Sequence, residues 1–480
     1  MKVPQNYTDR EVCIIGLGYV GLTLAVAMAE AGFIVHGVEK VPAIIAQLRK
    51  GRAHFLETDL DQRLSNQIAL GNLHLYGDLG SVSANPRVYI VTVGTPLLPT
   101  EKRTNLGPIT GVAEAIGLRL HPGDLVILRS TVRVGVSRSV VKPALDPSGV
   151  PYDLAFCPER TIEGKALEEL TSLPQIVGGL DEHATIRAAQ LFSFMTPTTV
   201  KVSSLETAEM IKLINNSQRD LMFGFANEVA HVCDGVGVAA AEVIRAGNMG
   251  YARASMPLPG PVGGPCLEKD PYILAEGVAH VRGVSRISLT GRNVNEKLPY
   301  ETAKRLRTQF SLEGRATTGL RIGICGLAFK GRPETSDLRG SLVVPLIQAL
   351  RAEFPACQII GYDPVVYDEE SATLGIEIVK SPQALFKDAD ICLFQTNHRS
   401  FEKLNLSELA ASMRQGGLIY DYWSQFAIER LHLPSGVRYA SLGGWCHLTA
   451  PAFAPEVPLE DHVRSYPQAK GIMPLRAYST

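Results

Sequence analysis

Long apolar runs are missing from this 480-residue sequence. No stretch reaches the roughly 18 apolar residues that a membrane-spanning helix needs. The first ten residues, MKVPQNYTDR, also lack the apolar centre of a secretion signal. We therefore predict a cytoplasmic protein with no membrane partner.

A surplus of charge of one sign is also missing. The 47 Lys and Arg residues nearly balance the 48 Asp and Glu residues, so the formal net charge is -1. A chain without an overall positive field does not attract nucleic acid or anionic lipid. We expect no nucleic-acid partner, and instead a small molecule or a second copy of the chain.

Closely spaced cysteine pairs are a third absence. The eight cysteines, at positions 13, 157, 233, 266, 325, 357, 392 and 446, include no Cys-x-x-Cys pair. This spacing argues against both a zinc site and a disulfide framework. We predict reduced thiols and no metal.

Short apolar runs rich in β-branched residues are present in the first part of the chain. They are EVCII, FIVHGVE, VYIVTVG and DLVILRS, with stretches of helical spacing such as Leu22–Ala31 between them. This alternation predicts a parallel sheet with crossover helices.

The pattern changes at Ser203. From there to about Asp234 no helix breaker occurs before Gly224, and apolar residues fall on most helical faces. Ser203 and Glu206 have the spacing of a capping box. We predict a long, largely buried central helix.

The glycine-rich segment EVCIIGLGYVG, residues 11–21, aligns without gaps on RIGICGLAFKG, residues 321–331. Each copy is followed by a helical stretch and then by a strand that ends in an acid, Glu39 or Asp363. We predict an α/β fold with two Rossmann-like parallel-sheet domains joined by a central helical domain. The expected domains are residues 1–202, 203–315 and 316–480, and the last ends in a Pro-rich, irregular tail.

The first copy has the features of a dinucleotide site. Gly16 turns the chain, Gly18 lets backbone approach a pyrophosphate, and Gly21 packs helix on strand. Glu39 would bond a ribose diol and repel a 2′-phosphate, although Lys40 beside it opposes that preference. We predict NAD as the cofactor; the alternative is a turn that serves packing alone.

The second copy departs from this pattern. Ala328 replaces the middle glycine, and Lys330 enters the loop. A methyl group there crowds a pyrophosphate, whereas a lysine offers a point charge to phosphate. The second copy is therefore expected to hold a different nucleotide, unless it is a duplicate with a structural role only.

Two pairs of polar residues are candidates for chemistry. Lys212 and Asn216, four residues apart, share a face of the central helix, where an ammonium without a partner is costly to bury. The alternative is that Lys212 extends to water. Glu159 and Glu163 follow a predicted strand and suit proton transfer, unless they are ordinary exposed glutamates. Thr131 follows another strand and could reach the nicotinamide or a water.

Cys266, in the stretch GGPCLEKDP, differs from the other cysteines in its setting. Gly263 and Gly264 allow a substrate to approach closely. Lys269 and a helix that begins near Asp270 would favour a thiolate. Cys266 is a candidate nucleophile; the alternative is an inert cysteine in a tight turn.

Together these motifs resemble the UDP-glucose/GDP-mannose dehydrogenase family, over about residues 10–445. The motifs that carry the resemblance follow the family's order: GLGYVGL, GTP, STV, PERTIEG, AEMIKLINNSQRD, NEVA, PGPVGGPCLEKDP, GLAFKGRPETSDLRGS and YDP. The resemblance implies an NAD-dependent enzyme that oxidises the C6 alcohol of a nucleotide sugar to a carboxylate.

The family chemistry implies roles for the candidate residues. An aldehyde formed by the first hydride transfer is captured by Cys266 as a thiohemiacetal, which a second oxidation turns into a thioester. Lys212 and Asn216 are expected to stabilise the oxyanion, and Asp270 to place a water with Thr131. Either of the two glutamates, Glu159 or Glu163, would handle protons in hydrolysis.

The resemblance also implies ligand contacts and a partner. The C-terminal domain is expected to hold the uridine nucleotide near Lys330, and Arg253 to reach a diphosphate across a homodimer formed by the central helix. Further expected contacts are Tyr19, Val20, Lys40, Thr95 and Thr131 with NAD, and Glu159, Arg160, Gly263, Phe329 and Arg339 with the sugar nucleotide.

The sugar is indicated by smaller features. PER at 158–160, NH at 397–398 and YDYW at 420–423 resemble the UDP-N-acetylhexosamine branch, whereas Lys269–Asp270 is commoner in the UDP-glucose branch. Pro265 has no counterpart in the family pattern. We predict a UDP-GlcNAc or UDP-ManNAc 6-dehydrogenase that serves surface polysaccharide synthesis, with UDP-glucose as the first alternative. A two-electron dehydrogenase without covalent catalysis and a non-catalytic nucleotide-binding module remain as other classes.

Overall fold

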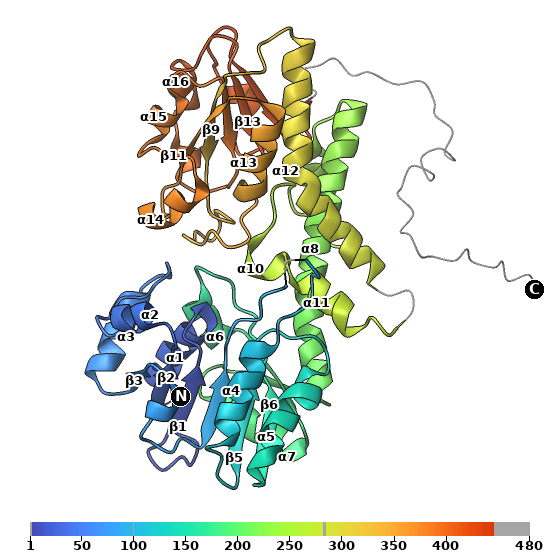
Figure 1. Ribbon diagram of the computed structural model, residues 1–480. Coiled ribbons are helices and arrows are strands. Elements are labelled where there is room, and N and C mark those ends of the chain that lie inside the picture. Colours follow the sequence, from blue (N-terminus) through green and yellow to red (C-terminus); the bar gives the residue numbers. More distant parts are fainter. Residues whose placement is uncertain (1, 99, 282–284, 446–480) are drawn as a thin grey trace, which may run out of the picture.

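A computed structural model of the chain describes residues 2–98, 100–281 and 285–445. Two α/β lobes are built on separate sheets, and a long helix, α8 (Leu205–Val236), runs past both of them (Figure 1). The predicted α/β fold with two Rossmann-like domains and a helical centre is confirmed. The predicted boundaries after residues 202 and 315 fall in connections between elements, and the predicted tail lies in 446–480, outside the described residues.

The first lobe contains an eight-stranded sheet in the order β3-β2-β1-β4-β5-β6-β7-β8. All neighbouring strands are parallel except β6 and β7. The strands are β1 (Glu11–Ile15), β2 (Ile34–Val38), β3 (Leu73–Tyr76), β4 (Val88–Val91), β5 (Asp124–Leu128), β6 (Tyr152–Phe156), β7 (Gln175–Gly179) and β8 (Thr199–Val202). The helices are α1 (Tyr19–Ala31), α2 (Pro42–Leu48), α3 (Leu60–Ala69), η1 (Leu79–Ser81), α4 (Gly107–Gly117), η2 (Ser137–Val141), α5 (Lys142–Leu145), η3 (Asp146–Ser148), α6 (Ala166–Ser172) and α7 (Glu182–Ser193).

The strands at the centre of this sheet are apolar throughout because helices cover both faces. Every residue of β4 and β5 is buried, and separate apolar clusters lie on the two sides of the sheet. A parallel strand that is buried on both faces has a continuous apolar sequence. The four apolar runs predicted as strands form β1, β2, β4 and β5.

The second lobe contains a six-stranded, fully parallel sheet in the order β11-β10-β9-β12-β13-β14. The strands are β9 (Arg321–Cys325), β10 (Gln358–Tyr362), β11 (Glu377–Ile378), β12 (Ile391–Phe394), β13 (Leu418–Asp421) and β14 (Arg438–Ser441). The helices are α13 (Val343–Glu353), α14 (Asp368–Ser371), η4 (Ala372–Leu374), α15 (Pro382–Phe386), η5 (Phe401–Lys403), α16 (Leu406–Ala410) and η6 (Ile428–Arg430).

The two glycine-rich copies differ in where their helices begin. In the first lobe α1 begins at Tyr19, inside the motif, whereas in the second lobe α13 begins only at Val343. The segment between Gly331 and Ser341 contains glycine, proline, serine and aspartate, which disfavour helix. The second copy therefore opens a long loop, residues 326–342, that we call the UDP-lobe loop.

The centre of the molecule is formed by α8 and the helices that pack on it, namely α9 (Ala240–Asn248), α10 (Gly264–Leu267), α11 (Asp270–Gly277) and α12 (Arg286–Leu312). Two details of the predicted central helix were wrong. Its N-cap is Ser204, whose side chain accepts from Thr207 N, rather than Ser203. One face is also exposed rather than buried, with apolar side chains at Ile214, Met222, Phe225, Val232 and Val236.

Among the described residues, we find no helix whose length and apolar character would allow it to cross a membrane.

Candidate active site

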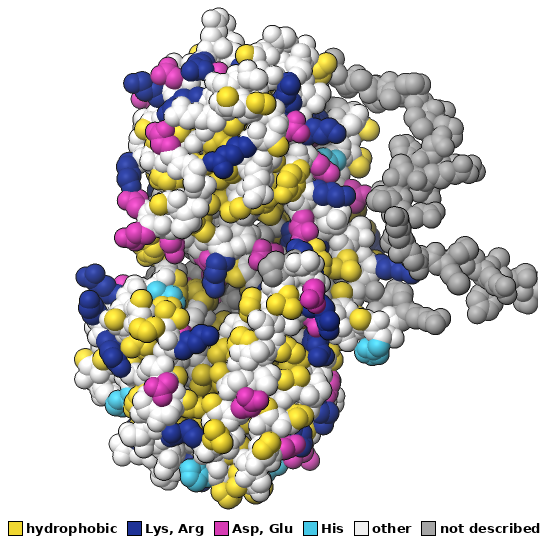
Figure 2. All heavy atoms as spheres, in the orientation of Figure 1, with side chains coloured by type: hydrophobic (Ala, Val, Ile, Leu, Met, Phe, Trp, Pro, Cys, Tyr) yellow, Lys and Arg dark blue, Asp and Glu magenta, His cyan; other side chains and the backbone are white. Residues whose placement is uncertain are grey.

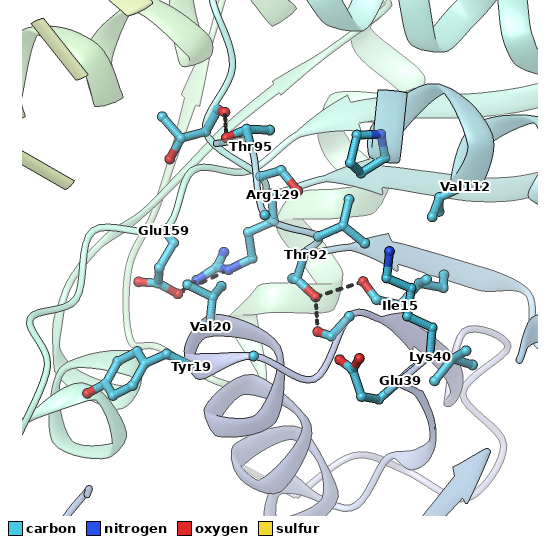
Figure 3. Close-up of a pocket in the computed structure, with 18 of the residues that line it drawn as sticks. Ile15, Tyr19, Val20, Glu39, Lys40, Thr92, Thr95, Val112, Arg129 and Glu159 are labelled. Carbon is cyan, nitrogen blue, oxygen red and sulfur yellow. Dashed lines mark hydrogen bonds and ion pairs between the residues drawn. The ribbon is translucent and has the colours of Figure 1, made fainter. Parts of the chain in front are cut away.

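A cavity of about 600 Å³ lies between the carboxyl ends of the first sheet, α8, the cysteine loop and the UDP-lobe loop. The surface is hollowed between the two lobes (Figure 2), and Figure 3 shows part of the cavity lining. Thirteen of the predicted site residues line it: Gly16, Gly18, Tyr19, Val20, Glu39, Lys40, Thr95, Thr131, Glu159, Glu163, Lys212, Cys266 and Arg339.

The glycine-rich end of the cavity has the shape that a dinucleotide requires. Gly16 has φ +95, and a Cβ built at Gly18 would meet no protein atom within 4 Å. The N-terminus of α1 follows directly at Tyr19, so its unpaired N–H groups and helix dipole favour a phosphate there. Gly21 serves packing as predicted, because its Cβ would lie 1.8 Å from the Gly16 carbonyl oxygen.

Glu39 lies at the end of β2 and is nearly buried. One carboxylate oxygen accepts from Leu17 N and the other from Val41 N, each at 3.0 Å. A carboxylate oxygen accepts more than one hydrogen bond, so both retain capacity for a ribose diol. Figure 3 shows Lys40 near the same end of the cavity.

Arg129, which the sequence analysis missed, holds Glu159 (Figure 3). Its Nε donates to Glu159 Oε2 at 3.1 Å, and its Nη1 donates to Gln175 Oε1 at 2.8 Å. Burial opposes ionisation of Glu159, but the Arg129 charge and the Thr161 N–H outweigh it, so the pKa of this carboxyl is lowered. The signal for Arg129 was available in the sequence, since an arginine directly follows the buried strand β5.

Glu163, four residues further on, has the opposite electrostatics. Thr335 Oγ1 donates to its Oε2 at 3.4 Å, Arg339 Nη2 lies 3.6 Å from its Oε1, and Lys330 Nζ donates to its backbone carbonyl at 2.7 Å. Burial, and then the charge of Asp337, raise the pKa of Glu163 to about 7 although Arg339 and Lys330 oppose them. The two glutamates therefore differ in protonation at neutral pH.

Lys212 and Asn216 share a face of α8, as predicted. Lys212 is 6% exposed and lines the cavity, and in the described part of the chain it makes no hydrogen bond or ion pair. Asn216 Nδ2 donates to Asp270 Oδ2 at 2.6 Å. Asp270 is fully buried, and its other oxygen, Oδ1, has no hydrogen-bond partner. A buried ammonium and a buried carboxylate oxygen thus await a ligand.

Cys266 is the one exposed cysteine among those described, and it faces the cavity from α10. The protein atoms packed around the thiol raise its pKa, whereas Lys212 and, less strongly, Lys269 lower it. The prediction that this setting favours a free thiolate was therefore wrong, because desolvation outweighs the two cations. Pro265 has a simple role, since it occupies the first turn of α10, where its missing N–H is tolerated.

Four of the predicted substrate contacts lie elsewhere in this single chain. Gly263 is buried where its Cβ would lie 2.1 Å from the Gly340 carbonyl oxygen, and the Phe329 ring covers Gly264. Arg160 donates to the Pro174 carbonyl, and the exposed Arg253 lies over the Tyr251 ring. The paired glycines thus let the UDP-lobe loop approach, rather than a substrate.

Models of three domains of one family match consecutive parts of the chain. The NAD binding domain of the UDP-glucose/GDP-mannose dehydrogenase family matches residues 10–196, its central domain 206–297 and its UDP binding domain 323–427. An NDP-N-acetyl-D-galactosaminuronic acid dehydrogenase of Ralstonia nicotianae is 30% identical over 434 residues, which are 88% of this chain and 97% of that protein. The chain belongs to the UDP-glucose/GDP-mannose dehydrogenase family. The predicted NAD cofactor and oxidoreductase class are confirmed with it, and the first lobe is the NAD-binding domain.

Two solved structures resemble the whole fold. A UDP-D-ManNAc dehydrogenase from Pyrococcus horikoshii is 27% identical with a TM-score of 0.81, and the match covers 90% of this chain and 99% of that one. A UDP-glucose dehydrogenase from Pyrobaculum islandicum is 26% identical with a TM-score of 0.79, and covers 88% and 96%. Enzymes named for different sugars thus match about equally well.

Proposed function

We propose that this enzyme oxidises the C6 alcohol of UDP-GlcNAc or UDP-ManNAc to the carboxylate through a covalent adduct on Cys266. The observation that carries the proposal is an accessible thiol, Cys266, in the same cavity as a buried ammonium without a protein partner, Lys212. The other six described cysteines lie outside that cavity. A dehydrogenase that stops at the aldehyde or ketone needs no such thiol.

In the first oxidation the hydroxyl proton and a C6 hydride leave, and an aldehyde forms. Bound NAD supplies the hydride acceptor for both oxidations. Lys212 stabilises the negative charge that develops on the C6 oxygen, and the water-poor cavity strengthens this attraction. Asn216 acts through Asp270, whose carboxylate it holds in place. Thr131 and Asp270 Oδ1 remain available to place a water.

In the second oxidation Cys266 Sγ adds to the aldehyde carbon and its proton passes to the C6 oxygen, which gives a thiohemiacetal. Loss of a second hydride and of the hydroxyl proton gives a thioester. Water then attacks the thioester carbonyl, the C–S bond breaks, and the carboxylate and the thiol are released. Because burial raises the pKa of Cys266, the Lys212 charge is needed to favour loss of the thiol proton.

Glu163 is the better of the two candidate bases for this hydrolysis. A base works best with a pKa near the working pH, and the pKa of Glu163 is about 7. Glu159 is held by Arg129 and instead orders its loop. We expect thioester hydrolysis to slow as the pH falls below about 7, and Glu163→Gln to slow it at every pH while the first oxidation persists. A Glu163→Gln variant with normal acid release would contradict this assignment.

The decisive test counts NADH per sugar for UDP-GlcNAc, UDP-ManNAc, UDP-glucose, UDP-galactose and GDP-mannose. We expect about two NADH per sugar, and no acid from Cys266→Ser. Cys357→Ser is the matched control, because Cys357 is the other described cysteine that is not fully buried and it lies outside the cavity. One NADH per sugar with an active Cys266→Ser would favour a two-electron dehydrogenase, and NAD binding without turnover a nucleotide-binding module.

UDP-glucose is the second candidate substrate. The motifs PER and YDYW and the names of two of the matched proteins support an N-acetylhexosamine, whereas Lys269–Asp270 and the similar UDP-glucose dehydrogenase structure support glucose. An N-acetylhexosaminuronate product would supply capsule or O-antigen synthesis. Turnover of UDP-glucose at least as fast as of both N-acetylated sugars would reject our choice.

The exposed apolar face of α8 supports the proposed homodimer. Its five apolar residues recur at spacings that place them on one side of the helix, and Phe225 is 53% exposed there. We expect light scattering to give a dimer for the intact enzyme and a smaller species for Phe225→Glu. The control is Leu118→Glu, since Leu118 is 91% exposed but lies on the first lobe. A monomeric wild type would contradict the proposal.

A further inference from the structure

The loop that presents Cys266 is held from behind by a buried polar network between α8 and α12. These two helices pack along each other (Figure 1), and they approach closely where a Cβ at Gly224 would lie 2.7 Å from the Gly291 carbonyl oxygen. Arg292 of α12 is fully buried beside this contact. A buried guanidinium requires several partners to offset the loss of hydration.

Arg292 finds those partners in three places at once. Its Nη1 donates to Asp220 Oδ1 of α8 at 2.7 Å and to the Leu267 carbonyl at 3.2 Å, and its Nη2 donates to the Val262 carbonyl at 3.0 Å. Leu267 directly follows Cys266, and Val262 lies four residues before it. The guanidinium therefore fixes the chain on both sides of the thiol.

A third backbone point is fixed by the same network. Asn227 donates to the Gly260 carbonyl at 3.1 Å and accepts from Gly260 N at 2.8 Å. Asn295 links Asn227 to Asp220, with distances of 2.9 Å to each. None of these side chains lines the cavity, so the network contacts the cysteine loop without reaching the ligand space.

We propose that Arg292 is a positioning residue for catalysis, whose three-way contact with Asp220, Val262 and Leu267 holds the Cys266 thiol in its attacking position. This proposal rests on the nucleophilic role proposed above for Cys266. Attack on a carbonyl carbon depends on sub-ångström placement of the nucleophile, and a misplacement of 1 Å costs roughly 100-fold in rate. Only arginine carries a planar fork of donors that can join three acceptors, so lysine cannot replace it.

The test compares Arg292→Lys with a matched variant on the same helix pair. Arg305 Nη1 of α12 pairs with Asp234 Oδ2 of α8 at 2.7 Å, and this pair makes no contact with the cysteine loop. Arg305→Lys therefore weakens the same helix packing while leaving Cys266 untouched. Both variants are examined as full chains for thermal stability, kcat, KM for the UDP-sugar, NADH affinity and iodoacetamide labelling of Cys266.

For Arg292→Lys we expect kcat to fall at least about tenfold while KM and NADH affinity stay near the wild-type values. Labelling of Cys266 is expected to accelerate several-fold, because a released loop exposes the thiol to water and its pKa returns towards the ordinary value. A merely structural role predicts that Arg305→Lys, at a similar loss of thermal stability, changes both quantities as much. That result would overturn the proposal.

Two further variants keep the outcome interpretable. If Arg292→Lys does not fold, Asn227→Ala frees only the Gly260 end of the loop, and we expect smaller changes of kcat and labelling in the same directions; unchanged values would overturn the proposal. Cys266→Ser tests the proposed function separately. Acid production by that variant would reject the covalent mechanism, whereas faster labelling in Arg292→Lys would still establish that Arg292 orders the loop.

Discussion

The glycine-rich loop after β1 and the one after β9 share their first turn but not their use. Gly16 and Gly326 have nearly equal positive φ angles, +95 and +89. In each lobe the acid at the end of the next strand accepts from the residue after that glycine, Glu39 from Leu17 N at 3.0 Å and Asp363 from Leu327 N at 2.6 Å. The acids thus brace the turn in both lobes.

The loops diverge after this shared turn. In the first lobe α1 begins at once, and open space beside Gly18 is left for a pyrophosphate. In the second lobe the chain continues as the UDP-lobe loop, whose Lys330 reaches the Glu163 carbonyl and whose Gly340 packs on Gly263. The position of the helix start decides whether such a loop cradles a cofactor or joins the lobes across the active site.

The largest effect is expected where the UDP-lobe loop meets the first lobe. A methyl group at Gly164 would lie 2.8 Å from both Pro333 Cβ and the Glu334 carbonyl oxygen. Gly149 also has a positive φ, +70, but a Cβ there would meet nothing within 4 Å. Both Gly→Ala variants carry the ~1–2 kcal/mol of a left-handed backbone, and Gly164→Ala should lose a further ~1–3 kcal/mol from the clash.

Urea unfolding of the two variants measures this difference. Equal losses would mean that the lobes separate without cost at this contact, and the loop would then not join them.

The next effect separates the two loops by cofactor binding. Gly18→Val fills the open space beside α1, so we expect NADH affinity to fall about 10- to 100-fold, the equivalent of losing one charge-assisted hydrogen bond. Ala328→Gly, at the matching position of the second copy, should leave NADH affinity unchanged. Fluorescence titration with NADH measures both. Weaker NADH binding by Ala328→Gly would break the distinction between the loops.

The smallest effect concerns the two acids. Glu39→Gln keeps the shape but loses the charge, so NADH affinity should fall about fivefold, since a charge-assisted hydrogen bond exceeds a neutral one by ~1 kcal/mol. NADPH should lose less affinity, because the repulsion of a 2′-phosphate disappears too. Asp363→Asn should change neither affinity. An unaltered ratio of NADH to NADPH affinity in Glu39→Gln would remove Glu39 from cofactor selection.

The features that the sequence predicted well are local ones. The motif at Gly16, Gly18 and Gly21 depends on backbone freedom within six residues, and the apolar runs of β4 and β5 depend only on burial of both faces. Glu39, Lys212 and Cys266 were found because short motifs surround them. The helix start of the second lobe was misjudged, since an aligned glycine motif does not show that a long loop follows it.

The sequence by itself determined the alternation of strands and helices, the cofactor turn, and the residue types available for chemistry, because each of these follows from neighbours along the chain. Only the tertiary structure decided which residues act on one another. Arg129 meets Glu159, Asn216 meets Asp270, and Arg292 meets the loop around Cys266 across 30, 54 and 25 or more residues. Such long-range contacts also set the electrostatics. Glu159 and Glu163 are alike in sequence, yet the Arg129 charge lowers the pKa of one, while burial raises that of the other.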